Sequence, residues 1–492
     1  MSFTPSKYQQ ALFGWIEQGK GSAILEAVAG SGKTTTIVEA LKLIPQDNRA
    51  VFLAFNRSIA EELKNRVPQH AFASTFHSAG FRAWSRVYPG VQVDDRKVMK
   101  LVRETPFAYT ETAPALANLV GLAKQRGIGV LAPDDEREWA DLIDHYDVNV
   151  AEGEEPEVIK QARIVLRRST STSDQVIDYD DMLYMPVLRG LALNRYAWVM
   201  IDEAQDTNGV RRALAGMMLD KDARMVAVGD THQAIYGFTG ADSEAMNLIQ
   251  QDFGCQRFPL SINYRSGRRI VTEAQKYVPE IEPREDAPEG LVAITSYRET
   301  PPEPGDAILC RLNAPLIEQA YEFISQGRGC RVLGRDIGQG LVRLVDKMDA
   351  RNLEELRDSL ESYRTREFLR FMRREQEGRA QGVRDRVNCI FAVINHLNVR
   401  ATVDDLKREL DNLFQEKPNG GKLLTLSTVH KAKGLEWNRV FIHGPELMPC
   451  KWAKMPWQKQ QERNLQYVAV TRARDALYYV PMTGGNHDNP SQ

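Results

Sequence analysis

An apolar stretch that runs into two closely spaced glycines and a lysine constrains this chain most. Residues 22–36 read Ser-Ala-Ile-Leu-Glu-Ala-Val-Ala-Gly-Ser-Gly-Lys-Thr-Thr-Thr, which predicts a strand, a tight turn and a helix that ends near Leu43. In such a turn the backbone N–H groups and the helix N-terminus together surround phosphate oxygens. Lys33 would reach the β and γ phosphates, and Thr34 would place its hydroxyl beside Mg²⁺. The residues predicted to bind a nucleotide here are Ala29, Gly30, Ser31, Gly32, Lys33, Thr34 and Thr35.

A second apolar stretch ends in acidic residues. Residues 196–206 read Tyr-Ala-Trp-Val-Met-Ile-Asp-Glu-Ala-Gln-Asp, which is typical of a buried strand with two adjacent acids at its carboxyl end. We expect Asp202 to hold Mg²⁺ together with Thr34. We expect Glu203 to be the general base that polarises the attacking water, because phosphoryl transfer mainly requires positioned water and neutralised charge. The two stretches together predict hydrolysis of a nucleoside triphosphate.

Length and composition limit the classes of protein that fit. A chain of 492 residues is too long for one hydrophobic core and suggests three or four domains. No apolar run approaches the about 18 residues that span a bilayer, and residues 1–7 lack the pattern of a signal peptide, so we expect a cytoplasmic protein without a membrane role. The net charge of −2 predicts that any nucleic-acid site is a local basic groove. The five cysteines are widely spaced, which favours reduced thiols over a metal cluster or disulfides.

The run Asp-Glu-Ala-Gln-Asp at residues 202–206 resembles the UvrD/Rep branch of the superfamily 1 helicases, and the similarity extends over most of the chain. It continues in four further segments, which are residues 226–241, 260–266, 424–437 and 461–474. Residues 54–60 and 74–78 are most similar to phage, bacterial and F-box-helicase relatives. The resemblance implies ATP and Mg²⁺ as cofactors. It also implies 3′ to 5′ translocation on single-stranded DNA and unwinding at single/double-strand junctions in replication, recombination or repair.

The resemblance also implies roles for individual residues. Gln233 would sense the γ phosphate, and Arg265 and Arg472 would neutralise charge on it during hydrolysis. The adenine would be read by Gln9, with Gln10 as an alternative, and stacked on Tyr264. Glu436 would support the nucleotide side. The implied DNA contacts are Phe55, Asn56, Phe76, His77, Tyr236, Phe238, Thr428 and His430. Thr35 and Thr239 stand where many relatives carry arginine, and Phe238 where many carry tryptophan.

The expected fold is α/β, with two RecA-like parallel-sheet motor domains that each carry a mainly helical insertion. The expected divisions are 1–90 with 175–258 (first motor domain, ATP binding), 91–174 (its insertion), 259–340 with 421–483 (second motor domain), 341–420 (a short insertion) and 484–492 (a disordered tail). The serine- and threonine-rich run 169–173 is interpreted as a linker that returns to the first motor domain. Strands are predicted in the second motor domain at 306–311, 330–334 and 439–444.

The second insertion is rich in arginine, which leaves two interpretations open. The arginines either form a face that touches DNA or lie on a solvated helix surface, and interspersed glutamates dilute their charge. They are Arg364, Arg366, Arg370, Arg373, Arg374, Arg379, Arg384 and Arg386.

The sequence leaves two rival functions open. A related motor would use the same residues mainly to strip proteins from single strands, and the sequence does not separate it from an unwinding enzyme because both translocate. A nucleotide-gated binding switch with little turnover is a different class, and the full catalytic set argues against it. Protein partners, host, oligomeric state and a preference for RNA or DNA are not encoded in these motifs.

Overall fold

The structure is a computed structural model that describes most of the chain. The described residues are 3–54, 56–110, 112–146, 148, 150, 153–171, 175–235, 244–326, 328–373, 377–414, 423–451 and 453–482. The chain divides into two compact units, residues 1–261 and residues 262–492. The predicted tail, 484–492, lies outside the described residues.

The first unit is built on a six-stranded parallel sheet with the strand order β3-β2-β6-β7-β1-β8. Its strands are β1 (Ala23–Ala27), β2 (Ala50–Ala54), β3 (Ala71–Thr75), β6 (Tyr196–Ile201), β7 (Leu219–Gly229) and β8 (Gln256–Leu260). Because all strands are parallel, their carboxyl ends meet at one edge of the sheet. The predicted nucleotide-binding turn follows β1, and the predicted acids follow β6.

Alternate residues of the central strands enter two different cores. Met200 packs with Phe52 on one face, whereas Val199 and Ile201 pack with Val51 on the other. A parallel sheet covered on both faces explains why these strands read as continuous apolar runs rather than as alternating patterns.

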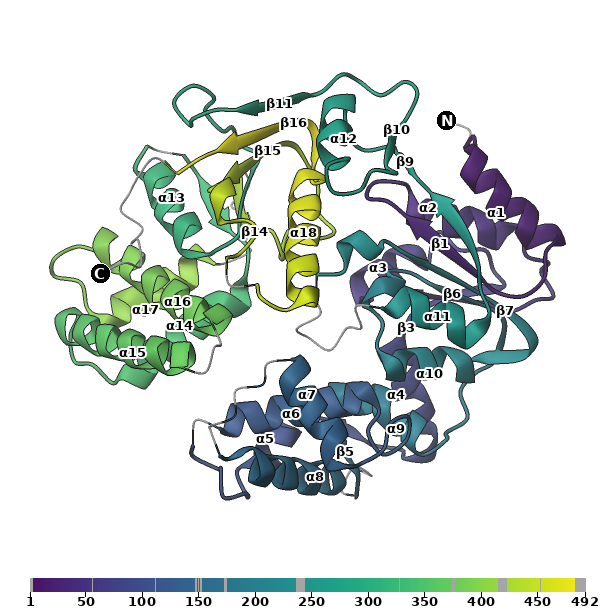
Figure 1. The fold of residues 1–492 in the computed structure, drawn as a ribbon, viewed down its shortest axis with the longest axis horizontal. Coiled ribbons are helices and arrows are strands. Elements are labelled where there is room, and N and C mark those ends of the chain that lie inside the picture. Colours follow the sequence, from purple (N-terminus) through teal and green to yellow (C-terminus); the bar gives the residue numbers. More distant parts are fainter. Residues whose placement is uncertain are drawn as a thin grey trace. The chain divides into compact units, whose positions relative to one another are not determined.

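Helices cover both faces of this sheet and also form a group of their own. They are α1 (Lys7–Gln18), α2 (Lys33–Lys42), α3 (Arg57–Leu63), α4 (Phe76–Val87), α5 (Lys97–Val102), α6 (Ala113–Arg126), α7 (Glu136–His145), α8 (Glu155–Ser171), α9 (Tyr179–Leu188), α10 (Gly209–Met217) and α11 (Ala245–Phe253). The short strands β4 (Gln92–Val93) and β5 (Val176–Ile177) pair with each other, at the points where the chain enters the helices α5 to α8 and leaves them. In Figure 1 the helices α5 to α8 gather beside α4, α9 and α10.

Two predicted boundaries differ from the structure of the first unit. Residues 169–171 continue helix α8 rather than forming a linker, because Ser169 is buried and the hydroxyls of Thr170 and Ser171 donate to carbonyls three residues earlier. Residues 172 and 173 lie outside the described residues. The predicted end of the first motor domain at 258 falls inside β8, whose pairing with β1 extends to Leu260.

The second unit contains another six-stranded sheet, in the order β11-β16-β15-β12-β14-β13, and its paired strands are parallel. Its strands are β11 (Leu291–Ile294), β12 (Ala307–Cys310), β13 (Cys330–Val332), β14 (Leu424–Thr428), β15 (Trp437–His443) and β16 (Ala473–Val480), with a separate pair β9 (Ile262–Asn263) and β10 (Glu282–Pro283). The predicted strands at 306–311, 330–334 and 439–444 are confirmed as β12, β13 and β15. Two parallel sheets in one α/β chain confirm the expected fold class.

The helices of the second unit divide between the sheet and a second helical group. They are α12 (Arg268–Ala274), α13 (Ala314–Ser325), α14 (Arg335–Met348), α15 (Leu353–Arg373), α16 (Glu377–His396), α17 (Val403–Leu413) and α18 (Pro456–Val470). The predicted start of the insertion at 341 falls inside α14, so the helical group begins earlier than expected. Asp385 of α16 accepts hydrogen bonds from the backbone N–H groups of Asn313 and Ala314, at 3.2 and 2.9 Å. This carboxylate ties the insertion to the first turn of α13.

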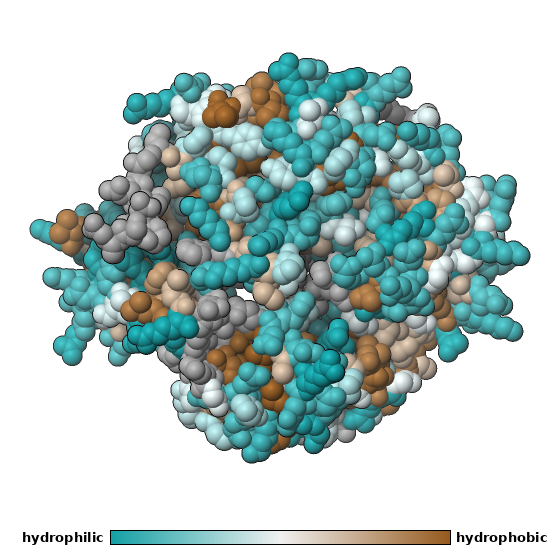
Figure 2. Space-filling model, in the orientation of Figure 1, coloured by the Kyte–Doolittle hydropathy of each residue, from teal (hydrophilic) through white to brown (hydrophobic). Residues whose placement is uncertain are grey.

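Among the described residues no helix is long and apolar enough to cross a bilayer. The face shown in Figure 2 is mainly hydrophilic, with apolar side chains in small separate patches.

Candidate nucleotide site

The loop between β1 and α2 has the backbone of a phosphate-binding turn. Gly30 and Gly32 have φ values of 66° and 77°, in the left-handed region that glycine adopts without strain. Gly32 caps α2 without a side-chain hydrogen bond, so the first N–H groups of the helix face the loop. The hydroxyl of Ser31 donates to the carbonyl of Val28 at 2.7 Å and closes the turn. This geometry suits a bound phosphate.

Lys33, the first residue of α2, lies among three carboxylates. Its Nζ is 3.4 Å from Oε1 of Glu203. Burial disfavours the charged ammonium, but the charges of Glu203, Asp230 and Asp202 outweigh it and raise the pKa of Lys33 above its usual range. Lys33 is therefore a cation at neutral pH, as binding of the β and γ phosphates requires.

Thr34 and Asp202 approach each other as the Mg²⁺ prediction requires. The Thr34 Oγ1 donates to Oδ2 of Asp202 at 3.4 Å. Burial, and then the charge of Glu203, raise the pKa of Asp202 to about 7, although Lys33 opposes the shift. A divalent cation beside Asp202 would favour its ionised form, and a hydroxyl with a carboxylate oxygen is a donor set that Mg²⁺ accepts. These two residues fit a magnesium ion.

Glu203 is held in an unusual backbone conformation. Its φ and ψ of 50° and 44° lie in the left-handed region, which costs a non-glycine residue free energy. The backbone N–H of Glu203 donates to Oδ1 of Asp202 at 2.9 Å, and its Oε2 accepts a hydrogen bond of 2.5 Å from Gln205 Nε2. Such local strain is typical of functional sites and supports the predicted role of Glu203.

Gln205 connects two strand ends in a way that the sequence did not predict. This buried side chain donates to Glu203 through Nε2, and its Oε1 accepts a hydrogen bond of 2.9 Å from the backbone N–H of Asp230. Asp230 in turn accepts a 2.6 Å hydrogen bond from Gln233 Nε2. Both Gln205 and Asp230 lie in motifs noted above, but only the placement of β7 beside β6 reveals their contact. A continuous chain of hydrogen bonds therefore runs from Glu203 to Gln233.

Gln9 lies next to the same helix, although its amide is engaged by protein groups. Its Nε2 donates to Thr36 Oγ1 at 2.8 Å, and its Oε1 accepts from the backbone N–H of Ser6 at 2.9 Å. Gln10 is exposed and donates to the carbonyl of Pro5. Reading of adenine by Gln9 stays a prediction, and it requires Gln9 to exchange these partners for the base.

In the second unit Arg265 and Glu436 form an ion pair. Asn263 fixes the backbone around Arg265, because its Oδ1 accepts hydrogen bonds from the N–H groups of Arg265 and Ser266 at 2.9 and 2.7 Å. The guanidinium of Arg265 pairs with Glu436 and also donates to the carbonyl of Thr471 at 3.1 Å. The ion pairs of Glu436 hold the pKa of its carboxyl below its usual range, although burial opposes them. Both remain candidates for nucleotide contact, as does the partly exposed Tyr264.

Arg472 is fully buried and bound to the protein. It donates to the carbonyls of Val468 and Leu435, each at 3.0 Å, and to Thr471 Oγ1 at 3.2 Å. Its exposed fraction is 1%. Contact of Arg472 with a γ phosphate stays a prediction, and in this conformation the guanidinium stabilises the junction between α18 and β16.

The predicted DNA contacts of the first unit are only partly described. Phe55, Tyr236 and Phe238 lie outside the described residues. Asn56 caps α3 by accepting from the N–H of Ile59 at 2.9 Å. Phe76 is 7% exposed and packs in the hydrophobic core, which does not favour the predicted stacking of its ring on a base. Burial and the charge of Arg211 lower the pKa of His77 to about 4, so its ring is neutral at physiological pH.

The predicted DNA contacts of the second unit follow β14. Thr428 is buried, and its Oγ1 accepts a 3.4 Å hydrogen bond from the backbone N–H of Lys431. Burial, and then the charge of Arg311, lower the pKa of His430 to about 3, so this ring is also neutral. The charge of Arg311 is balanced by Glu462, whose Oε1 lies 2.7 Å from Arg311 Nη2. DNA contact by Thr428 and His430 stays a prediction, and neither side chain would contribute a positive charge to it.

The arginines of the second insertion are partly neutralised. Arg364 pairs with Glu361 at 2.6 Å, and Arg370 pairs with Glu367 at 3.1 Å. Glu367 also pairs with Arg366. Arg374 lies outside the described residues. These pairs favour the interpretation of a solvated helix surface over that of a DNA-touching face.

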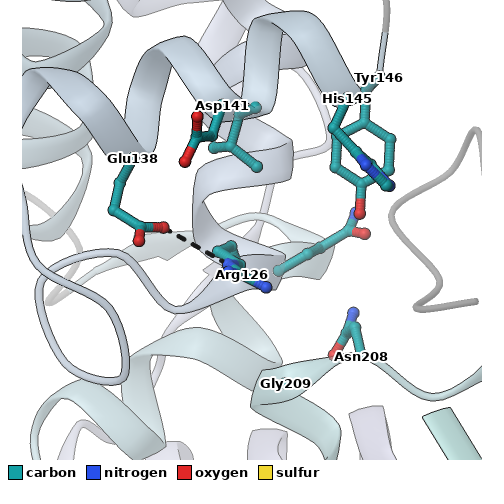
Figure 3. Close-up of a pocket in the computed structure, with 9 residues that line it drawn as sticks. Arg126, Glu138, Asp141, His145, Tyr146, Asn208 and Gly209 are labelled. Carbon is teal, nitrogen blue, oxygen red and sulfur yellow. Dashed lines mark ion pairs between the residues drawn. The ribbon is translucent and has the colours of Figure 1, made fainter. Parts of the chain in front are cut away.

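A polar pocket lies where the first insertion meets α10 (Figure 3). Arg126 of α6 reaches toward Glu138 of α7, with 3.6 Å between Nε and Oε2. Asn208 and Gly209 line the other side at the start of α10. The insertion therefore contacts the segment that directly follows the acidic run 202–206.

Taken together, the phosphate-binding turn after β1 and the acids after β6 define a P-loop nucleoside triphosphatase with a second parallel-sheet unit. Residues 10–254 match the family model of the UvrD/REP helicase N-terminal domain, and residues 338–483 match that of the UvrD-like helicase C-terminal domain. The chain belongs to the UvrD/Rep helicase family.

Curated relatives agree with this assignment. The ATP-dependent DNA helicase Rep of Escherichia coli K12 is 26% identical over 299 residues, which cover 53% of this chain and 41% of Rep. The ATP-dependent DNA helicase PcrA of Bacillus subtilis 168 is 22% identical over 613 residues, covering 94% of this chain and 81% of PcrA. F-box DNA helicase protein 1 of Schizosaccharomyces pombe is 22% identical over 495 residues, which cover 92% of this chain and 55% of that protein. The chain spans about two fifths of the length of Rep.

Proposed function

We propose that this chain is an ATP-dependent DNA helicase that translocates 3′ to 5′ along single-stranded DNA and separates duplex strands. The observation that carries the proposal is the cluster of Lys33, Asp202 and Glu203 at one edge of a parallel sheet. Family membership supports DNA as the substrate. The direction of movement, the preference for junctions and a role in replication, recombination or repair follow from the family resemblance alone.

Hydrolysis would use residues of both units. The turn at residues 29–32 and Lys33 bind the phosphates, and Glu203 takes a proton from the attacking water. Arg265 and Arg472 neutralise the charge that develops on the γ phosphate. Mg²⁺, when bound, draws charge from the phosphate oxygens, and Thr34 and Asp202 are the residues that would hold it.

Coupling to DNA would begin at the hydrogen-bonded chain that ends at Gln233. Tyr236 and Phe238 follow Gln233 closely in the sequence and are predicted to stack on bases, which contributes about 1–3 kcal/mol per base. Loss of the γ phosphate would change the partners of Gln233. The hydrogen bonds from Gln233 through Asp230 and Gln205 to Glu203 then give a route by which DNA binding affects the general base.

The rival motor, which strips proteins from single strands, differs from a helicase in its product, because it does not separate duplex strands. Strand displacement should be measured on duplexes with a 3′ or a 5′ single-stranded tail, with Glu203→Gln as the inactive control. We expect ATP-dependent displacement of the 3′-tailed duplex only. Removal of a protein block from single strands without any displacement of duplex would favour the rival. Displacement of the 5′-tailed duplex alone would contradict the proposed direction.

A nucleotide-gated switch would bind ATP and turn it over barely at all. The strained Glu203 argues against a switch, because a switch needs no positioned general base. Steady turnover stimulated by single strands would exclude it.

A further inference from the structure

One carboxylate in the second unit is shared by two arginines. Glu436, directly before β15, pairs with Arg265 through Oε2 and with Arg474 through Oε1. The three side chains are 30%, 18% and 47% exposed, respectively, so solvent screens the arrangement only in part. Only Arg265 and Glu436 were singled out by the sequence.

The backbone holds the two arginines close to each other. Ser266 Oγ donates to the carbonyl of Ala473 at 2.7 Å, and the N–H of Gly267 donates to the carbonyl of Arg474 at 2.9 Å. The N–H of Trp437 donates to the carbonyl of Arg472 at 3.0 Å. The segments that carry the three charged side chains are thus bound to one another, and the shared ion pair is built into the fold.

This arrangement affects how easily Arg265 leaves its partner. An arginine that engages a phosphate must break its ion pair with a carboxylate. Leaving a partly buried carboxylate without an ion pair costs free energy. Arg474 reduces that cost because Glu436 remains paired. The positive charge of Arg474 also repels that of Arg265 and so weakens its hold on Glu436.

We propose that Arg474 is a positioning residue for ATP hydrolysis, which keeps Glu436 paired and thereby releases Arg265 to the γ phosphate. The inference rests on the proposed function, in which Arg265 acts on that phosphate. Without Arg474, Glu436 pairs with Arg265 alone and retains it, so fewer bound ATP molecules are engaged by Arg265.

The test measures DNA-stimulated ATP hydrolysis by the full chain at saturating ATP. Arg474→Gln should lower kcat about three- to tenfold with little change in KM, as expected for loss of one partly exposed ion pair. Arg474→Lys should retain most of the activity, because an ammonium still pairs with Glu436. Arg474→Gln introduced into a Glu436→Gln background should have less than about a twofold effect, because no carboxylate is left to retain Arg265.

Other outcomes overturn the inference. An unchanged kcat in Arg474→Gln, or an equal loss in the wild-type and Glu436→Gln backgrounds, would show that Arg474 does not act through Glu436. A fall in kcat that only follows a loss of folded protein, measured by thermal unfolding, would reduce Arg474 to a structural residue. If the wild-type chain hydrolyses no ATP, the proposed function itself fails. That result is distinct from an active wild type in which substitution of Arg474 has no effect.

Discussion

The arrangement around Glu203 depends on a single glycine. Gly229 ends β7, and a Cβ at this position would lie 2.6 Å from Gln205 Oε1, 2.8 Å from Met246 Sδ and 3.0 Å from Gln205 N. Such contacts require the neighbours to move. The position of Gln205, and through it that of Glu203, therefore relies on the absence of a side chain at residue 229.

Gly229→Ala should for this reason impair hydrolysis and stability together. We expect kcat to fall about tenfold or more and the free energy of unfolding to fall by about 1–3 kcal/mol, as for overpacked sites. Steady-state ATP hydrolysis and urea unfolding measure the two effects. Gly14→Ala in α1 is the matched control, because nothing lies within 4 Å of its added Cβ. Full activity in Gly229→Ala would show that the contact with Gln205 is not needed.

Much of the nucleotide site could be predicted from residue types alone. Lys33, Thr34, Asp202 and Glu203 come together as expected because each follows a strand of the same parallel sheet. Gln205 could not be given its role, since its partner Asp230 directly follows β7 and the order of strands is not visible in the sequence. The burial of Phe76 was missed for a similar reason, because packing of its ring depends on elements distant along the chain.

At the level of helices, buried charges join α5 and α6 to the start of α9 within the first unit. Lys124 of α6 lies 2.5 Å from Asp178 and 2.7 Å from Asp181, at the start of α9. Lys97 of α5 pairs with Asp181 at 2.6 Å. Lys124 and Asp181 are both fully buried, so this network is satisfied only while the three helices stay together.

Lys124→Met should destabilise the first unit strongly. It would leave buried carboxylates with fewer cations, which costs about 3–5 kcal/mol. Lys160→Met is the control, because the ion pair of Lys160 with Glu157 is exposed and should contribute less than about 1 kcal/mol. Chemical denaturation measures both. A similar small loss for the two variants would contradict a structural role of the network.

Asp180, beside this network, should make stability depend on pH. Burial, and then the charge of Asp178, raise its pKa from 3.8 to about 6. A carboxyl with a raised pKa in the folded state contributes stability that is fully present below 3.8 and is lost as pH rises through 6. Asparagine does not ionise and retains an oxygen that accepts from Gln125.

We therefore expect Asp180→Asn to be more stable than the wild type at pH 8, with a free energy of unfolding higher by on the order of 1 kcal/mol and a higher unfolding temperature. The difference should vanish near pH 4. Thermal unfolding at both pH values, with the exposed Asp358→Asn as control, measures it. An equal difference at pH 4 and pH 8 would contradict the raised pKa.

The element boundaries show where sequence patterns are weakest. The strands β12, β13 and β15 were predicted because short apolar runs between turn residues are distinctive. The second helical group is predicted to start at 341, but its first helix, α14, begins at Arg335. An amphipathic helix has the same sequence pattern whether it packs on a motor domain or in an insertion. The serine and threonine residues at 169–171 suggested a linker, but side-chain to backbone hydrogen bonds allow them to end a helix.

For the whole molecule, the proposal requires the second unit to act on a nucleotide held by the first. Arg265→Lys should therefore leave binding of a fluorescent ATP analogue nearly intact and reduce hydrolysis about a hundredfold or more, because lysine lacks the planar fork of arginine. Arg269→Lys is the control, since its ion pair with Glu289 is exposed. Unimpaired hydrolysis in Arg265→Lys would confine the chemistry to the first unit.

The claim that this chain is a DNA-driven ATPase is tested most directly by its hydrolysis rate with and without single-stranded DNA. Wild type and Glu203→Gln should be compared at saturating Mg²⁺ and ATP. We expect the wild type to hydrolyse ATP at a rate that single strands increase, and Glu203→Gln to be slower by at least about a hundredfold. A wild-type rate that does not change when DNA is added, or hydrolysis that persists in Glu203→Gln, would contradict the claim.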